Sequence, residues 1–365
     1  MFKFLLKPIY HLEPPALGID ISDLSFKVVE IMKHQDHHEL VRYGEYEIPA
    51  GIIEKGILKQ EDALTKTLVA GLESIMGRHF HKYYLVASLP EQETFLRIVP
   101  LSPERTENIE ESIRQEIEAN IPIAPNDLYV DSQVLPKHAE DTTTAVLLVA
   151  TSKEIADPYI RAMKNAGLNL KALELESQAL ARSVVPFEFT KPAMVVDFGA
   201  TSTGISILAE GIIEFTSTLP FGGRNLEQTI KTKLGVSAED ARTLKINVGM
   251  DRTQEQGRVF DALKSSIDTL IQQIQDYISY HYDHRVAGLS SESLQAIFLS
   301  GGDANLIGLS SYISLKLKIP TTLANPFVNI VSKNAQEVPA IPYTSALKYA
   351  VALGLALRGS EEFEM

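Results

Sequence analysis

The chain contains one strand-turn-strand pattern twice, once near its start and once past its midpoint. Residues 19–22 (IDIS) end an apolar strand with an aspartate and a polar turn, and residues 196–199 (VDFG) repeat that order. The alignment also places Ser202 on Ser25. Two copies of one design predict an α/β chain with two related lobes, each carrying an aspartate at the end of a buried strand.

Length and composition agree with two lobes and exclude several classes of protein. The 365 residues, 45% of them hydrophobic, are enough for two domains that each bury a core. The sequence has no cysteine, which excludes disulfides, thiolate metal sites and a cysteine nucleophile, and fits a reducing compartment. The formal net charge of -13 would repel phosphate backbones and no basic stripe offsets it, so we expect no nucleic-acid partner.

The apolar runs are too short for a membrane-spanning helix, which needs about 20 residues. Residues 350–357 form one of the longest. Residues 1–10 mix aromatic and aliphatic side chains with two lysines, which fits either a short helix at a membrane surface or a tail packed on the domain. Both interpretations remain open for this tail.

The order of strand and helix patterns predicts how the chain is divided between the lobes. A single helix is expected from Pro103 through Ile117, one long helix over residues 254–282, and a helix of small residues over 346–357. The expected segments are an N-terminal tail (1–15), the first lobe core (16–83), an inserted subdomain (84–166), a return to the first lobe (167–190), the second lobe core (191–220 and 291–340), its upper subdomain (221–290), and a C-terminal helix returning to the first lobe with an acidic tail (341–365).

The two aspartate turns predict a site for a metal-bound polyphosphate. A carboxylate at a strand end can hold a hydrated divalent cation, and the amides of a tight turn can bind phosphate oxygens. Two such hairpins facing each other would bind a triphosphate from both sides, with Asp20 and Asp197 holding Mg²⁺ through water. A plain hairpin turn is the alternative for either copy alone.

Two further patterns bear on this site. The loop at residues 199–204 (GATSTG) has the glycine spacing of a P-loop but continues as a strand and lacks the phosphate lysine, so a hairpin is the better interpretation. Residues 300–302 (SGG) follow an apolar strand and precede a helix. Glycines there allow a base or a phosphate to approach the backbone near the positive end of a helix.

Taken in order, these motifs resemble the actin/Hsp70/FtsA ATPase superfamily, and within it the PilM family of type IV pilus assembly proteins. The resemblance rests on the two aspartate hairpins and on residues 176–180 (ESQAL), 222–223 (GG), 300–302 (SGG) and 352–356 (ALGLA). Residues 18–22, 121–134 and 221–226 are particularly similar to PilM. The resemblance implies an actin-like (ribonuclease H-like) two-lobed fold with an FtsA/PilM-type inserted 1C-like subdomain.

The same resemblance implies an ATP and Mg²⁺ site, in which Glu176 would lie near the attacking water. In the two phosphate loops the implied residues are Asp20, Ser22, Asp23, Leu24, Ser25, Lys27, Asp197, Gly199, Ala200, Thr201, Ser202 and Thr203. Gly301 and Gly302 would form the adenosine loop, and Glu239 and Lys245 would reach the sugar and base. The remaining implied cofactor-binding residues are Gly222, Gly223, Asp303 and Asn305. Because the first loop carries the bulky Leu24 and lacks glycine, we expect ATP binding and at most a weak ATPase activity.

As a PilM-like protein the chain is expected to be a cytoplasmic scaffold, peripheral at the inner membrane, that switches with nucleotide. The implied partners are the cytoplasmic N-terminal peptide of PilN, other pilus platform proteins and motor ATPases, and further copies of the chain. Two alternatives remain: a small-molecule kinase of the same superfamily, for which no substrate base can be named, and an FtsA-like or type II secretion platform protein.

Overall fold

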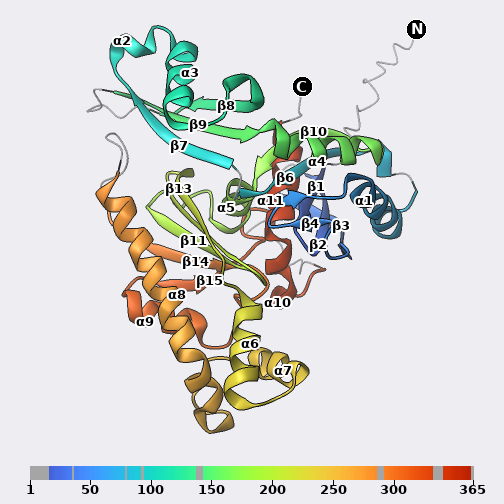
Figure 1. Ribbon diagram of the computed structural model, residues 1–365, viewed down its shortest axis with the longest axis vertical. Helices are drawn as coiled ribbons and strands as arrows, with labels where there is room; N and C mark the ends of the chain where they lie inside the picture. Colours follow the sequence, from blue (N-terminus) through green and yellow to red (C-terminus); the bar gives the residue numbers. More distant parts are fainter. Residues whose placement is uncertain are drawn as a thin grey trace, which may run out of the picture.

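The computed structural model describes residues 16–362 except residues 35–36, 79, 92–93, 137–142, 286–291 and 332–339. Figure 1 shows two larger sheets, a smaller sheet with its own helices at one end of the molecule, and a helical extension at the other end. The tail expected at residues 1–15 and the last three residues of the acidic tail lie outside the described residues.

The two larger sheets share one strand order. It is β10-β6-β1-β2-β3 in the first lobe and β15-β14-β11-β12-β13 in the second. In each lobe a three-strand antiparallel meander is followed by two strands that join in parallel. The strands are β1 (Ala16–Ile21), β2 (Ser25–Lys33), β3 (His38–Glu47), β6 (Tyr84–Leu89), β10 (Asn169–Leu175), β11 (Ala193–Phe198), β12 (Thr203–Ala209), β13 (Ile212–Leu219), β14 (Ala296–Ser300) and β15 (Thr321–Leu323). The shared order confirms the predicted pair of related α/β lobes.

Helices cover the sheets and form the extension in Figure 1. In the first lobe α1 and α4 pack on each other, and in the second α6 packs on both α7 and α8. Their bounds are α1 (Glu61–Met76), α4 (Lys153–Asn165), α5 (Glu176–Val184), α6 (Gly223–Leu234), α7 (Ala238–Asn247), α8 (Arg258–Asp283), α9 (Leu309–Leu317), α10 (Tyr343–Ala346) and α11 (Ala350–Glu362). A short ribbon of β4 (Ile53–Glu54) and β5 (Ile57–Leu58) precedes α1.

The longest helix, α8, follows from the spacing of its apolar residues. Leu263, Ile267, Leu270 and Ile274 lie three or four positions apart, and each is at most 1% exposed in the core of the second lobe. The helix begins at Arg258 rather than at the expected residue 254, because Gly257 has a φ of 78° and interrupts the helical backbone. The structure therefore confirms the amphipathic helix and shortens it.

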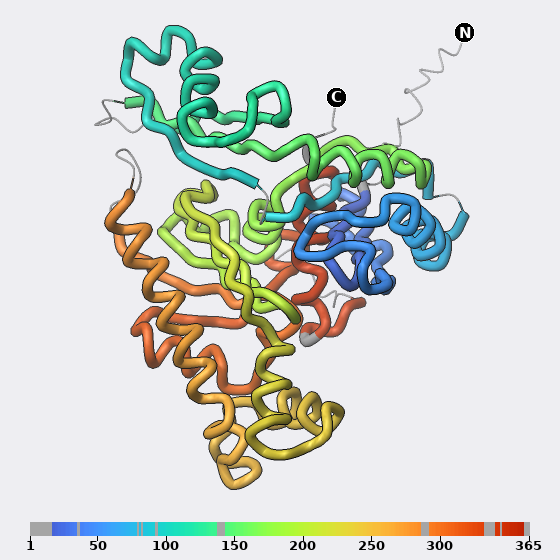
Figure 2. Tube along the Cα trace, in the orientation of Figure 1, coloured from blue at the N-terminus to red at the C-terminus, as the bar shows by residue number. Residues whose placement is uncertain are grey.

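A pair of helices, α5 and α11, lies between the two large sheets. One side of α11 contributes Val351 and Leu355 to the core of the second lobe, and another contributes Leu353 and Leu357 to a cluster with strand β2 of the first lobe. Figure 2 shows the red C-terminal helix beside the blue first strands, although these segments lie at opposite ends of the sequence. We call α11 the inter-lobe helix.

Close packing of the inter-lobe helix depends on glycine at two positions. A Cβ atom on Gly354 would lie 1.7 Å from the carbonyl oxygen of Ala179 in α5. A Cβ atom on Gly18 in β1 would lie 2.0 Å from the carbonyl oxygen of Ala352. Since both neighbours are backbone atoms, no rotamer change could relieve either contact. The small-residue pattern of the last predicted helix is therefore required by its neighbours on two sides.

The third sheet has the order β7-β9-β8, built from β7 (Thr94–Leu101), β8 (Leu128–Val134) and β9 (Thr144–Ser152). The inserted unit was expected to span residues 84–166. Two segments at the ends of that range, β6 and α4, belong to the first lobe instead. Strand β6 pairs with β1 and β10 in the first large sheet, and α4 packs on α1. Both segments are apolar enough to fit either the inserted unit or the first lobe. Contacts with distant residues of the first lobe decide their place.

The helix expected from Pro103 through Ile117 is also two helices. The first, α2 (Pro103–Thr106), spans four residues, and α3 (Ile109–Asn120) starts anew. The side chain of Asn108 accepts a hydrogen bond from the amide of Glu111 at 3.2 Å, which caps α3 separately. Isoleucines 113 and 117 still pack against the third sheet, so the predicted apolar face is correct.

A buried carboxylate holds β10, α5 and the inter-lobe helix together. Glu174, 4% exposed, accepts hydrogen bonds from Arg182, one of them at 2.7 Å, and lies 3.5 Å from the guanidinium of Arg358.

We expect Glu174→Gln to lower the free energy of unfolding by about 2 kcal/mol, since two guanidinium groups lose their counter-charge while both remain partly exposed. Urea denaturation measures this loss. As a control, Glu61→Gln breaks a surface ion pair with Arg161 and should cost less than about 1 kcal/mol. Equal losses in the two variants would contradict the expectation.

Candidate functional site

A cavity of about 820 Å³ lies between the two lobes, where the carboxyl ends of their strands meet. Both aspartate hairpins open on it, as do the turn after β14 and the start of α5. Among the predicted site residues, those that line the cavity are Asp20, Ser22, Asp23, Leu24, Ser25, Lys27, Glu176, Asp197, Gly199, Ala200, Thr201, Ser202, Gly301, Gly302 and Asp303. Its size is in the range of small-ligand pockets in proteins.

The two hairpin turns have matching geometry. The amide of Ser22 donates to the carbonyl of Ser25 at 2.9 Å, and the amide of Gly199 donates to the carbonyl of Ser202 at 3.0 Å. In the second turn the amide of Ala200 has no acceptor among the described residues. A turn that leaves amides exposed to a cavity can bind phosphate oxygens, so the second hairpin fits a phosphate loop.

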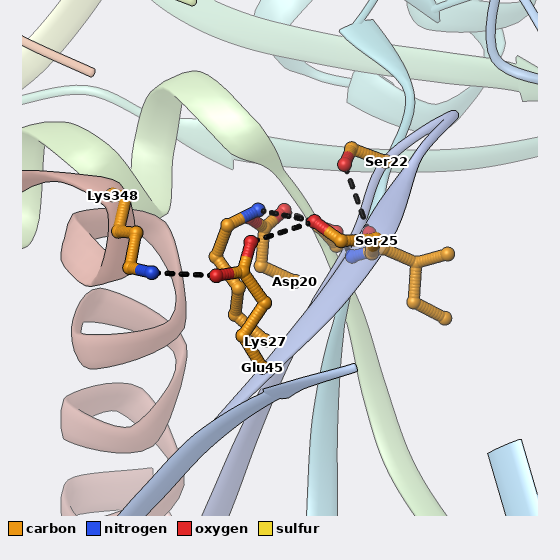
Figure 3. A network of polar contacts seen from close by, with 8 residues as sticks. Asp20, Ser22, Ser25, Lys27, Glu45 and Lys348 are labelled. Atoms are coloured by element: carbon orange, nitrogen blue, oxygen red, sulfur yellow. Dashed lines mark hydrogen bonds and ion pairs between the residues drawn. The ribbon is translucent and has the colours of Figure 1, made fainter. Parts of the chain in front are cut away.

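Asp20 is held in place by two neighbours from the first lobe. Ser88 donates from its hydroxyl to one carboxylate oxygen at 3.3 Å, and the ammonium of Lys27 lies 3.6 Å from the other. Figure 3 shows Asp20 and Lys27 side by side on the hairpin, with Ser25 beyond them. Asp20 is 7% exposed, so these partners, and any cation in the cavity, take the place of water around its carboxylate.

The carboxylates of the cavity repel one another. Burial, followed by the negative charge of Asp20, raises the pKa of Asp197 to about 6. Burial and then the charges of Asp20, Glu91 and Asp197 raise the pKa of Glu176 well above its ordinary value. A cation placed among these groups would relieve the repulsion, so the cluster fits a divalent metal.

The metal would be held through water rather than by a full set of protein ligands. No group of three or more His, Cys, Asp or Glu side chains in the described part of the chain is arranged to hold an ion directly. Magnesium retains several waters in nucleotide sites, with one or two carboxylates and phosphate oxygens completing its shell. Asp20 and Asp197 together with a bound polyphosphate fit that arrangement.

The first hairpin is less open to phosphate than the second. The carboxylate of Asp23 accepts hydrogen bonds from the amides of Lys55 at 2.8 Å and Gly56 at 2.9 Å, so it is not free to bind a ligand. The carbonyl of Leu24 accepts from the amide of Ile48, which ties the turn to the end of β3. Asp23 thus stabilises the hairpin, and the side chain of Leu24 occupies part of the cavity wall.

Three of the predicted residues support the second hairpin from behind. The amide of Gly223 donates to the carbonyl of Gly199 at 3.0 Å, and a Cβ on Gly222 would lie 2.6 Å from that carbonyl. The hydroxyl of Thr203, which is fully buried, donates to the carbonyl of Phe221 at 2.6 Å. These contacts fix the loop, and the three residues do not line the cavity.

The turn after β14 gives its two glycines different roles. Gly301 has a φ of 92°, and a Cβ there would lie 2.6 Å from a carboxylate oxygen of Asp197, so the turn itself requires glycine. A Cβ on Gly302 would meet nothing closer than the Cβ of Lys348 at 4.0 Å. Gly302 therefore offers open space beside the backbone, as an adenosine loop needs.

The residues expected near the sugar and base are only partly brought to the site. Lys245 is buried and forms ion pairs with Glu227 at 2.7 Å and with Asp303. Glu239 is exposed on α7, and neither it nor Asn305 lines the cavity. In this structure Lys245 fixes Asp303 and the turn beside it, while Glu239 lies apart from the site.

Several cavity residues were missed by sequence reasoning, and four of them form polar contacts with one another in pairs. Glu91 accepts hydrogen bonds from the hydroxyl of Ser177 at 2.8 Å and from its amide at 3.1 Å, and so caps the start of α5 next to Glu176. Glu45 and Lys348 form an ion pair at the cavity wall. Ser177 was visible only as part of the motif after Glu176, and the other three stand in no recognisable motif.

No helix in the described ranges is long and apolar enough to cross a membrane.

A family model described as type IV pilus assembly protein PilM matches residues 18–360. A solved PilM-PilN type IV pilus biogenesis complex superimposes with a TM-score of 0.76 at 23% sequence identity, covering 95% of this chain and 99% of the other. MreB5 of Spiroplasma citri bound to AMPPNP gives a TM-score of 0.53 at 11% identity, covering 94% and 96%. At these identities the likeness to solved structures shows the fold alone, which is the actin-like fold.

A sequence relative adds a partial match. Cell division protein FtsA of Bacillus subtilis (strain 168) is 24% identical over 194 residues, which are 49% of this chain and 44% of FtsA. The chain therefore spans less than half the length of that relative.

Proposed function

Because the chain belongs to the PilM family of type IV pilus assembly proteins, we propose that it is a nucleotide-binding scaffold of the pilus assembly platform. The observation that carries the nucleotide part is the pair of matching acidic hairpins across one inter-lobe cavity. The AMPPNP-bound MreB5, which shares the fold, supports this choice of ligand. ATP with Mg²⁺ is the proposed ligand of the cavity.

In the proposed complex each side of the cavity has its own task. The amides of the second turn bind phosphate oxygens, and Lys27 supplies a positive charge beside the first turn. Asp20 and Asp197 would hold the hydrated Mg²⁺, which would neutralise phosphate charge. Glu176, fixed by the cap that Glu91 places on α5, would orient a water near the terminal phosphate. Because the bulky Leu24 forms part of the cavity wall at the first turn, we expect ATP to bind and to be hydrolysed slowly at most.

The test is a titration of the purified protein with a fluorescent ATP analogue, with and without Mg²⁺. We expect saturable binding that depends on Mg²⁺ and that unlabelled ATP displaces. ATP hydrolysis under the same conditions should be slow or undetectable. Absence of binding at millimolar nucleotide in the presence of Mg²⁺ would exclude the nucleotide part of the proposal.

Ionisation of Asp197 should reduce the stability of the ligand-free protein as the pH rises. Because the pKa of Asp197 is about 6 in the folded chain and 3.8 in the reference state, the folded chain binds more protons between these values. The free energy of unfolding therefore contains a favourable contribution below about pH 4 that is lost as the pH rises through 6, on the order of 3 kcal/mol.

Denaturant unfolding from pH 4 to pH 7.5, compared with Asp197→Asn, measures this contribution. The difference in stability between variant and wild type should grow in favour of the asparagine variant across that range. Added Mg²⁺ and ATP should reduce the difference at pH 7.5. Parallel pH profiles for the two proteins would contradict the assignment.

We also propose that the scaffold binds the cytoplasmic N-terminal peptide of PilN and is thereby held peripherally at the inner membrane from the cytoplasmic side. A PilM-PilN complex is the source of the solved structure with a TM-score of 0.76, which supports this partner. Other platform proteins, motor ATPases and further copies of the chain are additional candidate partners. A pull-down with the PilN peptide, with and without Mg²⁺-ATP, tests the proposal. Equal failure under both conditions would reject this partner.

A further inference from the structure

Two lysines stand among the carboxylates of the cavity wall, and both are already engaged. Lys27 belongs to the first hairpin, whereas Lys348 belongs to the helical turn η5 (Leu347–Tyr349), which leads directly into the inter-lobe helix. Neither Lys348 nor its partner Glu45 follows from any motif of the sequence. Their position at the cavity raises the question of what they do when a ligand enters.

The polar contacts form one continuous chain across the wall. The ammonium of Lys348 contacts Oε2 of Glu45 at 2.5 Å, and Oε1 of Glu45 accepts a hydrogen bond from the hydroxyl of Ser25 at 3.0 Å. That hydroxyl accepts from the ammonium of Lys27 at 3.3 Å, which in turn pairs with Asp20. Figure 3 shows Lys348 reaching from its helix to Glu45, with Ser25 and Lys27 on the other side of that carboxylate.

The Glu45–Lys348 pair joins two parts of the fold. Glu45 lies on β3, the strand at the end of the first large sheet, and Lys348 precedes α11, which packs into the cores of both lobes. The contact therefore connects the first sheet to the inter-lobe helix at the edge of the cavity. On its other side Lys348 lies next to Gly302, the open glycine of the second lobe.

The ion pair is weak enough for Lys348 to leave Glu45 when another anion enters the cavity. The side chains of Lys348 and Glu45 are 36% and 31% exposed, so the contact is screened and shifts an equilibrium by no more than about fivefold. Burial opposes ionisation of Glu45, but the bond from Lys348 and the charge of Lys27 outweigh it and lower the pKa. Glu45 is thus an anion at neutral pH, and an entering polyphosphate competes with it for the same cation.

We propose that Glu45 and Lys348 form a latch that a nucleoside triphosphate opens. In the ligand-free protein Glu45 holds Lys348 and so fixes the start of the inter-lobe helix against β3. A bound triphosphate takes Lys348 over, and the polar contact between η5 and β3 is lost. This step rests on the proposed nucleotide site and adds a route from the ligand to the packing between the lobes.

Nucleotide affinity in four proteins tests the exchange: the wild type, Glu45→Gln, Lys348→Met and the double variant, each titrated with Mg²⁺ and the fluorescent ATP analogue. We expect Glu45→Gln to tighten binding about threefold and Lys348→Met to weaken it. In the Lys348→Met background, Glu45→Gln should have less than half of its effect on the logarithm of the affinity, because the carboxylate acts through this lysine. Glu61→Gln, which breaks an ion pair of similar exposure outside the cavity, should leave the affinity unchanged.

A gain from Glu45→Gln that persists in full without Lys348 would mean that Glu45 only repels the ligand through its charge, and would overturn the latch. No gain, or weaker binding, in Glu45→Gln would overturn it as well.

Hydrogen exchange of the ligand-free proteins separates the latch from the nucleotide site. In Glu45→Gln and in Lys348→Met the amides of residues 346–352 should exchange faster than in the wild type, and the double variant should add nothing further. Unchanged exchange in Glu45→Gln would refute the latch even if nucleotide binds. Faster exchange in a protein that binds no nucleotide would keep the contact but refute both its opening by triphosphate and the proposed function.

Discussion

Replacement of Asp197 by alanine is expected to weaken Mg²⁺-dependent ATP binding at least about tenfold without destabilising the ligand-free protein. Asp197 carries no ion pair or hydrogen bond that would be lost from its side chain within the described structure, and burial and Asp20 raise its pKa to about 6. Its charge is therefore a cost to the folded chain when no cation is present. Removing it should weaken binding and leave the melting temperature equal or higher.

Titration of the variant with the fluorescent analogue, combined with thermal unfolding, measures both halves of this expectation. Asp261→Ala, an exposed aspartate on α8, is the control and should bind like the wild type. Asp20→Ala is less informative, because it also leaves Lys27 and Ser88 without their partner. Wild-type affinity and Mg²⁺ dependence in Asp197→Ala would contradict the metal role.

Gly354→Ala is expected to cost at least about 3 kcal/mol of folding stability, the largest effect on stability that we expect from one added methyl group in this chain. The new Cβ would lie 1.7 Å from the carbonyl oxygen of Ala179, which is far inside van der Waals contact. Relief requires α5 and α11 to move apart, and both helices are packed into the core between the lobes.

The matched control is Gly302→Ala, where the same methyl group would meet open space. Urea denaturation of the two variants should show a large loss for Gly354→Ala and a loss below about 1 kcal/mol for Gly302→Ala. Similar stabilities for the two variants would show that the helices can separate at little cost.

The sequence predicted the lobes and the position of the cavity because both depend on local patterns. An aspartate between an apolar strand and a polar turn occurs twice. When the two lobes face each other, the strand ends that carry Asp20 and Asp197 both lie at the space between them. The two matching turns then follow from the repeat.

What the sequence did not predict depends on contacts between distant residues. Glu45 and Lys348 lie 303 positions apart, and Glu91 lies 86 positions from Ser177, so nothing local connects the members of either pair. Strand β6 was assigned to the inserted unit for the same reason, because the sequence of an apolar strand does not determine which sheet the strand joins.

The sequence also did not predict which groups single charged side chains contact. Asp23 was expected in the phosphate loop, but its carboxylate binds the amides of the turn at residues 55–56. Lys245 was expected near the nucleotide, but Glu227 and Asp303 neutralise it. In both cases the residue lies near the predicted place, and a neighbour from another segment decides what its side chain contacts.

The packing of Gly18 against the inter-lobe helix has a consequence for how the protein is made. Strand β1 leaves the ribosome long before its neighbour Ala352, which lies more than 300 positions further along the chain. At about 5–20 residues per second, the strand waits on the order of tens of seconds before that neighbour arrives. Throughout synthesis the nascent first lobe therefore displays an uncovered apolar surface, and a chaperone that binds such surfaces would have its best opportunity on this protein before translation ends.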